Sequence, residues 1–380
     1  MQVRQTFKYR LVLNRAQETA LVETLDRCRE LYNAALQERR EAYRLNHKTL
    51  TFAHQSAELP AVKVERPEYR NVFSQTLQDV LHRLDRAYQA FFRRVVGGAK
   101  PGFPRFQGRH RYDSFTYPQY GNGATLDYDG GKWGRLTLAK LGSFKVRMHR
   151  AVAGTIKTVT LRRDGEQWFV CFSCLVDVAP LPPTDTVTGV DLGLLHFATL
   201  ADGATIENPR PLRRSLKKLK RAQQQLSRAQ KGKHHRARAK AVVVKLHRQI
   251  RNQRADFCHK AARRLINEYG TVVFEDLKIR NMVQNHRLAL SISDAGWGQF
   301  VQCCVVKAES AGRQVLFVDP RYTSQRCSNC GERQHLELSK RWYSCPRCGL
   351  ELDRDQNAAR NILRLGCSPR AHGHVEAAPL

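Results

Sequence analysis

The sequence predicts a multidomain protein with an α+β amino-terminal part and an α/β carboxy-terminal part. Three observations support this fold class. Apolar residues recur at helical spacing over residues 15–96, alternating segments with turn signals follow to about residue 180, and short apolar strands among helices fill the rest. Two Cys-x-x-Cys pairs near the end indicate an inserted metal-binding segment. At 380 residues the chain can form about two or three domains.

The charge balance predicts a large polyanionic partner. The formal net charge is +31, from 65 Lys and Arg against 34 Asp and Glu. Such a chain repels itself until counter-charge binds, which makes nucleic acid the expected partner and a membrane surface the competitor. No segment approaches the apolar length that spans a bilayer, and "MQVRQTFKYRLVL" lacks the core of a signal peptide. We therefore expect no membrane association and an intracellular location.

The amino-terminal elements follow from local signals. Residues 3–13 read as a strand, and Asn14 with Gln17 resembles a capping box that opens a helix. Helical spacing continues to Gly97-Gly98, which ends the pattern. The alternating segments that follow are typical of a β-barrel or sandwich, and we expect the first strand to complete it.

The Pro-rich stretch "APLPPT" at 179–184 marks a boundary. After it come the strands "VTGVDLG" and "HFATL", with a hairpin turn at Asp202-Gly203. Residues 210–264 hold twenty Lys and Arg against one acid, on a helical pattern of two arms around Gly232. A strand "TVVFEDL", a helix near 296–310 and a strand "QVLFVDP" precede the cysteines.

Four cysteines have the spacing of a structural zinc site. Cys327 and Cys330 form one pair, Cys345 and Cys348 the other, with fourteen residues between the pairs and a glycine after each. Four thiolates make the closed tetrahedral shell of structural Zn²⁺, with no open position for catalysis. Cys171 and Cys174 share the two-residue spacing, but they lie in an alternating strand and point to opposite faces. We interpret them as packed core thiols.

Three carboxylates are candidates for a magnesium site. Asp191 interrupts an apolar strand, Glu275 ends another, and Asp355 opens the final helix. Carboxylates converging from two strands and a helix suit a two-metal phosphoryl-transfer site, because Mg²⁺ prefers hard oxygen ligands. The residues alone leave alternatives open: Asp353 and Asp355 could each be a helix cap, and Asp276 could be the inward acid instead of Glu275.

The order of these motifs resembles one family. "GVDLG", "VVFEDL", "DPRYTSQRCSNCG", "CPRCG" and "DRDQNAARNI", together with "KPGFPRF" and "AGWGQF", are similar to the TnpB (OrfB) proteins of bacterial insertion sequences, which are relatives of compact type V CRISPR effectors. The resemblance extends over nearly the whole chain. It implies a RuvC (RNase H-like) nuclease domain with an inserted four-cysteine zinc finger, preceded by a wedge β-barrel that is split by a helical recognition module.

The resemblance and the segmentation together predict the domain boundaries. The wedge barrel would comprise residues 1–14 and 99–182, with the helical recognition module at 15–98 between its two parts. The RuvC domain would comprise 183–320, which includes the basic helical hairpin 210–268, and its final helix 351–365. The zinc-finger insert would be 321–350, and 366–380 would be a disordered tail.

The resemblance also implies an activity. Asp191, Glu275 and Asp355 would be the catalytic acids and would bind two Mg²⁺ ions. A guide RNA from the transposon end would pair with one strand of double-stranded DNA, beside a short adjacent motif that the protein reads, and the RuvC site would cut both strands in turn. We expect one protein per guide RNA, in the bacterial cytosol on nucleoid DNA.

Two segments are predicted to contact nucleic acid. The hairpin would line the guide–target duplex, and in "KPGFPRFQGRHRYDSFTY" basic residues alternate with Phe103, Phe106, Tyr112 and Phe115. A solvated charged face and a barrel entrance with core aromatics are the respective alternatives. The candidate contacts are Lys217, Lys218, Lys220 and Arg221 in the hairpin, and Lys100, Arg105, Arg109 and Arg111 in the other segment.

Two other functions compete with guided cleavage. One is a transposase that joins DNA strands with an acidic triad. Nothing in the sequence resembles a tyrosine nucleophile motif, and a zinc ribbon between Glu275 and Asp355 is not typical of such enzymes. The other is a guided DNA-binding regulator that does not cut, which changed acids would have supported. All three acids are present, which favours the nuclease.

Overall fold

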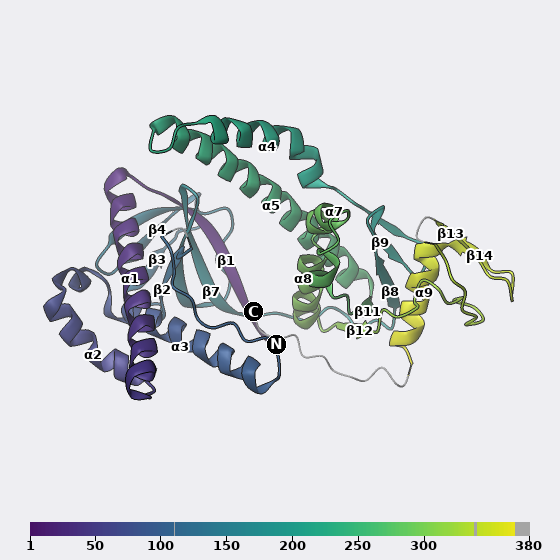
Figure 1. The fold of residues 1–380 in the computed structure, drawn as a ribbon, viewed down its shortest axis with the longest axis horizontal. Coiled ribbons are helices and arrows are strands. Elements are labelled where there is room, and N and C mark those ends of the chain that lie inside the picture. The colour runs from purple at the N-terminus through teal and green to yellow at the C-terminus, as the bar shows by residue number, and fades with distance from the viewer. Residues whose placement is uncertain (110, 338–339, 369–380) are drawn as a thin grey trace. The chain divides into compact units, whose positions relative to one another are not determined.

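The computed structural model describes residues 1–109, 111–337 and 340–368. The chain forms two compact units: Gln2–Asp177 is the first, and Met1 with the chain from Val178 onward is the second (Figure 1). Most of the predicted tail, residues 369–380, lies outside the described residues. Gly366, the first residue of that predicted tail, is the last residue of a helix. Within the described ranges, no helix is long and apolar enough to cross a membrane.

The first unit contains a seven-stranded antiparallel sheet of order β2-β6-β7-β1-β5-β4-β3. The amino-terminal strand pairs with β7 on one side and β5 on the other, so strands from before and after the helices share one sheet, as the sequence predicted. The strands are β1 (Gln2–Val12), β2 (Ser114–Tyr117), β3 (Ala124–Asp127), β4 (Trp133–Leu138), β5 (Gly142–Arg147), β6 (Thr155–Asp164) and β7 (Gln167–Asp177).

Helices of the first unit share a core with this sheet. The predicted capping box is confirmed: the Gln17 N–H donates to Asn14 Oδ1 at 2.8 Å, and the Asn14 N–H donates to Gln17 Oε1 at 3.0 Å. Leu25, Leu81 and Phe172 belong to one buried cluster that joins helices and sheet. The helices are α1 (Arg15–Asn46), α2 (Phe52–Glu65), the 3₁₀ helix η1 (Pro67–Asn71) and α3 (Ser74–Val96).

The second unit contains a five-stranded mixed sheet of order β10-β9-β8-β11-β12. β8, β11 and β12 run parallel, and β9 and β10 are antiparallel to their neighbours. The predicted hairpin turn is confirmed, with Gly203 at a φ of +95° between β9 and β10. The strands are β8 (Val187–Leu192), β9 (His196–Leu200), β10 (Thr205–Glu207), β11 (Thr271–Glu275) and β12 (Gln314–Val318), with β13 (Trp342–Ser344) and β14 (Glu351–Asp353) as a separate pair.

The two predicted basic arms are helices that pack against each other. Gly232, with a φ of +82°, lies in the turn between α4 and α5, where a left-handed backbone favours glycine. The remaining helices are short or lie beside the sheet. The helices of this unit are α4 (Pro211–Arg228), α5 (His234–Glu268), α6 (Ile279–Met282), α7 (Ala289–Ala295), α8 (Trp297–Ala311) and α9 (Arg354–Gly366).

Helices cover both faces of the five-stranded sheet (Figure 1). Val272 and Phe274 of β11 join the buried cluster of α5 and α8, whereas Val273 between them packs with Ile362 of α9. This is the alternation expected of a strand buried on both sides. Gly189 of β8 lies directly against the backbone of α9, so it is on the face of the sheet that α9 covers.

Gly189→Ala is expected to lower the free energy of unfolding by about 3 kcal/mol. A Cβ at Gly189 would lie 2.2 Å from the carbonyl oxygen of Ala359 and 2.5 Å from the backbone nitrogen of Leu363, and backbone atoms cannot move aside cheaply. The matched control is Gly298→Ala in α8, whose Cβ would meet only a side-chain carbon at 3.5 Å. Urea unfolding of the full chain measures both variants, and equal midpoints would contradict the close approach of α9 to β8.

Candidate functional site

Asp191 and Glu275 lie on the same face of the five-stranded sheet. β8 and β11 run parallel, with Gly189 opposite Val273 and Val190 opposite Phe274. Side chains two residues apart along a strand share a face, so Asp191 lies on the face of Gly189 and Glu275 on that of Val273. That is the face covered by α9. The two carboxylates are therefore brought together at the carboxyl ends of adjacent parallel strands.

Asp355 joins this pair from the first turn of α9. The helix is capped by Asp353, whose Oδ1 accepts hydrogen bonds from the N–H groups of Asp355 at 2.8 Å and Gln356 at 3.2 Å. Asp355 does not cap the helix. Its side chain is 8% exposed, and its charge acts on Asp191. Of the two acids that the sequence left open as caps, Asp353 is the cap and Asp355 belongs to the carboxylate cluster.

The second open alternative concerned Glu275 and Asp276. Asp276 is exposed, and its carboxylate pairs with the ammonium of Lys278. Glu275 is half-buried, and its charge acts on Asp191. Glu275 is the last residue of β11 and shares the α9 face with Val273, whereas Asp276 lies just beyond the strand. The structure makes Glu275 the inward acid.

The carboxylate cluster is electrostatically unfavourable without a cation. Burial raises the pKa of Asp191 well above its usual range, and the charges of Glu275 and Asp355 raise it further, against a lowering effect of Arg354. Burial also raises the pKa of Glu275, and a hydrogen bond from Thr323 opposes that shift. Each acid would gain from a divalent cation that offsets this repulsion and desolvation.

Two arginines stand beside Asp355. Arg354 Nη2 lies 3.4 Å from Asp355 Oδ1, and Arg341 Nη1 lies 3.7 Å from Asp355 Oδ2. They neutralise part of the negative charge on the α9 side of the cluster. The donor set of Asp191, Glu275 and Asp355 consists of hard carboxylate oxygens, which fits Mg²⁺.

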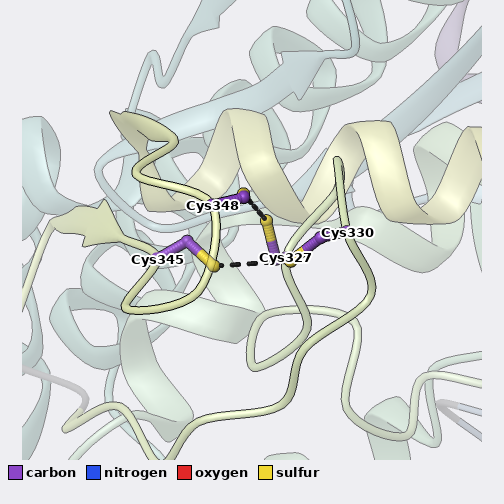
Figure 2. Close-up of side chains that lie close together, drawn as sticks. All are labelled: Cys327, Cys330, Cys345 and Cys348. Atoms are coloured by element: carbon purple, nitrogen blue, oxygen red, sulfur yellow. Dashed lines mark hydrogen bonds between the residues drawn. The ribbon is translucent and has the colours of Figure 1, made fainter.

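The four predicted cysteines converge on one point (Figure 2). Cys327 Sγ lies 3.6 Å from Cys348 Sγ, and Cys330 Sγ lies 3.5 Å from Cys345 Sγ, with all four thiols free. Tetrahedral Zn²⁺ with bonds of about 2.3 Å would hold its sulfur ligands about 3.8 Å apart. Within the described ranges these cysteines are the one group of three or more Cys, His, Asp or Glu whose ligand atoms all lie within 4.8 Å. They fit structural zinc, and the three carboxylates are spread more widely.

Both cysteine pairs fold into the same turn. The N–H groups of Gly331 and Gly349 each donate to the carbonyl of the first cysteine of their pair, Cys327 or Cys345, at 3.0 Å. Each first cysteine donates its own N–H to the carbonyl five residues on, at 2.8 and 2.9 Å. The glycines have φ values of +79° and +68°, which side-chain-bearing residues rarely adopt. This explains why each pair is followed by glycine.

The other Cys-x-x-Cys sequence forms no such group. Cys174 is buried on the core face of β7, whereas Cys171 is half-exposed on the opposite face. The prediction of a packed core thiol is therefore confirmed for Cys174 and wrong for Cys171, and the two side chains point to opposite faces as predicted.

A buried hydrogen-bond chain links the cysteine cluster to the carboxylates. Thr323, 3% exposed, donates its hydroxyl proton to Glu275 Oε1. Asn361 Nδ2 donates to the carbonyls of Thr323 at 2.9 Å and Arg326 at 2.7 Å. Asn357 Nδ2 donates to the same Arg326 carbonyl at 2.7 Å, and its Oδ1 accepts from the N–H of Ser328, next to Cys327, at 2.9 Å. Sequence reasoning missed these residues as site residues. The available signal was a pair of asparagines four positions apart on the apolar face of the last helix.

Thr323→Val is expected to weaken Mg²⁺ binding about tenfold, because the Glu275 carboxylate loses the hydroxyl that orients it. The shape of the side chain is kept, so folding should be retained. Calorimetric titration of the full chain with Mg²⁺ measures the effect. Thr323→Ser restores the donor and should bind as the unaltered chain does, and equal affinity for all three proteins would refute the orienting role.

The predicted basic contacts are exposed in both units. Four of these predicted contacts lie in α4 (Lys217, Lys218, Lys220 and Arg221), and four lie between α3 and β2 (Lys100, Arg105, Arg109 and Arg111). Arg109 is the one of these eight that also has an ion-pair partner in the described chain, Asp26 at 3.0 Å.

The four aromatic residues of this second segment divide into two pairs. Phe103 and Phe106 are 44% and 42% exposed, whereas Tyr112 and Phe115 belong to the core of the first unit. Phe106 carries the guanidinium of Arg40 over its ring, at 5.3 Å from the centroid. The core-aromatic alternative is therefore confirmed for Tyr112 and Phe115, and contact of Phe103 and Phe106 with nucleic acid stays a prediction.

Family models match three parts of the chain. The OrfB model, described as "Probable transposase", matches residues 170–286, and a model described as "Cas12f1-like, TNB domain" matches residues 297–362. A third, described as "Helix-turn-helix domain", matches residues 1–48. In this structure residues 1–48 form strand β1 and the single long helix α1.

Relatives and a solved structure match the chain from end to end. A protein of Streptomyces pristinaespiralis named "Putative RNA-guided DNA endonuclease" is 35% identical, over 98% of this chain and 92% of its own. "Putative RNA-guided DNA endonuclease InsQ" of Escherichia coli (strain K12) is 33% identical, over 98% and 94%. The solved structure of the mini-RNA-guided endonuclease CRISPR-Cas_phi3 shares the fold at a TM-score of 0.55, with 9% identity over 96% of this chain and 92% of that one. The chain belongs to the OrfB (TnpB) family, as its motifs predicted.

Proposed function

We propose that this protein is an RNA-guided DNA endonuclease that hydrolyses phosphodiester bonds at Asp191, Glu275 and Asp355. The observation that carries the proposal is the convergence of these three carboxylates, from two adjacent parallel strand ends and the first turn of α9, on one face of the sheet. Carboxylates gathered in this way suit phosphoryl transfer assisted by divalent cations. Regulators that bind without cutting have no need of such a cluster.

Each residue of the site has a distinct task in this proposal. The three carboxylates would hold Mg²⁺, and Thr323 orients the carboxylate of Glu275. Bound Mg²⁺ supplies Lewis-acid stabilisation of the phosphoryl oxygens and a more acidic water. Asp353 would stabilise α9 as its cap and take no part in the metal site. The cysteine cluster would hold structural Zn²⁺ and brace the loop that carries Thr323.

The names of the relatives and the positive charge of the chain indicate its partners. The relatives in Streptomyces and Escherichia coli are named for RNA guidance and DNA cleavage. The net charge of +31 and the exposed basic side chains of α4 suit two phosphate backbones. We assign guide RNA from the transposon end and double-stranded target DNA as the partners, with one protein per guide RNA in the bacterial cytosol.

The domain assignment is part of the proposal. The sheet of the first unit would be the wedge barrel (1–14 and 99–182), interrupted by the helical recognition module (15–98). The sheet shared by β1 and the later strands supports this interruption. The mixed sheet and α9 would form the RuvC domain (183–320 and 351–365), with the zinc finger (321–350) inserted between Glu275 and Asp355.

A plasmid-depletion experiment tests the function. The protein is expressed together with its native flanking locus in cells that carry a plasmid library, in which a guide-matched target lies beside randomised bases. Guided cleavage predicts loss of plasmids that bear one adjacent motif. An undepleted library, with RNA retained on the purified protein, would overturn the endonuclease proposal in favour of guided binding.

A further inference from the structure

We propose that the first unit contains a pocket for an unpaired base of the guide RNA, an inference that rests on the proposed function. A cavity of about 960 Å³ lies between the second half of α1, residues 49–51, the second half of α3 and Phe103. This volume is in the range of small-ligand sites and exceeds what one aromatic base needs. None of its lining residues belongs to the carboxylate cluster or the cysteine cluster.

Aromatic rings on the cavity wall are unusually exposed. Tyr43, Phe92 and Phe103 are 61%, 55% and 44% exposed. The ring of Phe103 makes edge-to-face contacts with Tyr88 and Phe91, with centroids 5.5 and 5.2 Å away. Exposed apolar side chains gathered in a hollow mark a binding site rather than a core. Rigid rings of this kind offer flat faces to a planar ligand.

Guanidinium groups accompany these rings. Arg40 and Arg44 line the cavity one turn apart on α1, and both are exposed. Arg39 is 7% exposed, and its Nε and Nη1 donate to Gln55 and Asp85 at 2.8 and 3.0 Å. Its Nη2 is buried and has no hydrogen-bond partner. The cavity therefore has Arg39 fixed in its wall by two hydrogen bonds, beside two exposed cations, Arg40 and Arg44, that can bind phosphate.

This combination matches an unstacked nucleotide. Aromatic faces and guanidinium planes stack on bases, and arginines one helical turn apart can bind the flanking phosphates. A folded RNA presents unpaired bases in its loops, whereas the bases of duplex DNA stay inside the helix. The guide RNA is therefore the partner that can fill the pocket before any target is bound.

Substitution of the stacking rings measures the contribution of the pocket. Tyr43→Ala and Phe92→Ala are each expected to raise the Kd of the full chain for its guide RNA about tenfold. Tyr43→Phe keeps the ring and should bind normally. Val64→Ala is the matched control, because Val64 is 67% exposed on α2 and lies outside the cavity lining. Circular dichroism melting confirms that each variant is folded, and unchanged Kd values for both alanine variants would overturn the proposal.

Photo-crosslinking identifies the occupant. Ultraviolet irradiation of the purified protein–guide RNA complex, without DNA, should join the RNA to a peptide that contains Tyr43 or Phe92. Crosslinks to DNA alone, after target is added, would overturn the RNA assignment. Loss of a dimer in light scattering of the alanine variants, with unchanged RNA affinity, would show that a second copy of the chain covers the rings. The RNA crosslink does not require cleavage, so it is read independently of the plasmid-depletion result.

Discussion

Asp355→Ala should abolish DNA cleavage, with a fall in rate of about 10³-fold or more, and leave guide-dependent DNA binding intact. The substitution removes one carboxylate of the metal site, while the exposed basic residues of α4 remain. Asp191→Ala should have the same effect, because its carboxylate belongs to the same cluster. Single-turnover cleavage of a guide-matched duplex measures the rate, and a filter-binding assay measures the affinity.

Asp353→Ala is the control for this result. Asp353 is two residues from Asp355 and carries the same charge, but its side chain caps α9. Its loss should cost about 1 kcal/mol of stability and leave most of the cleavage rate. A variant lacking Asp353 that is as inactive as the variant lacking Asp355, with both proteins folded, would refute the separate roles of the two acids.

Cys345→Ser should lower the zinc content of the protein, its melting temperature by about 5 °C and its cleavage rate. Cys345 is a buried member of the cluster, and the three remaining thiols cannot complete the tetrahedral shell. Activity should fall as well, because the loop that precedes the cysteines carries Thr323, which contacts Glu275. Metal analysis and thermal unfolding of the full chain provide the measurements.

Cys171→Ser is the matched control for zinc binding. Cys171 belongs to a Cys-x-x-Cys sequence of the same spacing, but in a strand of the first unit. Zinc content should not change in this variant. Full zinc content and an unchanged melting temperature after Cys345→Ser would show that the cluster does not bind structural zinc.

Local chemistry was sufficient for several predictions. The capping box of Asn14 and Gln17 and the turn at Asp202-Gly203 depend on neighbouring residues, and both are present. The cysteine cluster could be predicted because each pair, with its glycine, forms a self-contained turn. In such cases the sequence spacing itself determines which atoms can meet.

Other features depend on packing between distant segments. A strand pattern shows that Glu275 and Asp276 point to opposite faces, but not which face α9 covers. That choice depends on the register of β11 with β8 and on the close approach of α9 to Gly189. For the same reason the role of Thr323 could not be predicted: its contact with Glu275 joins residues 48 positions apart.

The most direct test of the carboxylate site compares Glu275→Ala with Asp276→Ala. The two acids are consecutive, yet Glu275 faces the cluster and Asp276 pairs with Lys278 at the surface. Each variant is loaded with guide RNA, and its single-turnover cleavage of a matched duplex is measured over a range of Mg²⁺ concentrations. We expect no cleavage by the Glu275 variant at any Mg²⁺ concentration and a near-normal rate for the Asp276 variant. Equal rates for the two variants, or loss of activity in the Asp276 variant alone, would contradict the assignment of Glu275 to the carboxylate site.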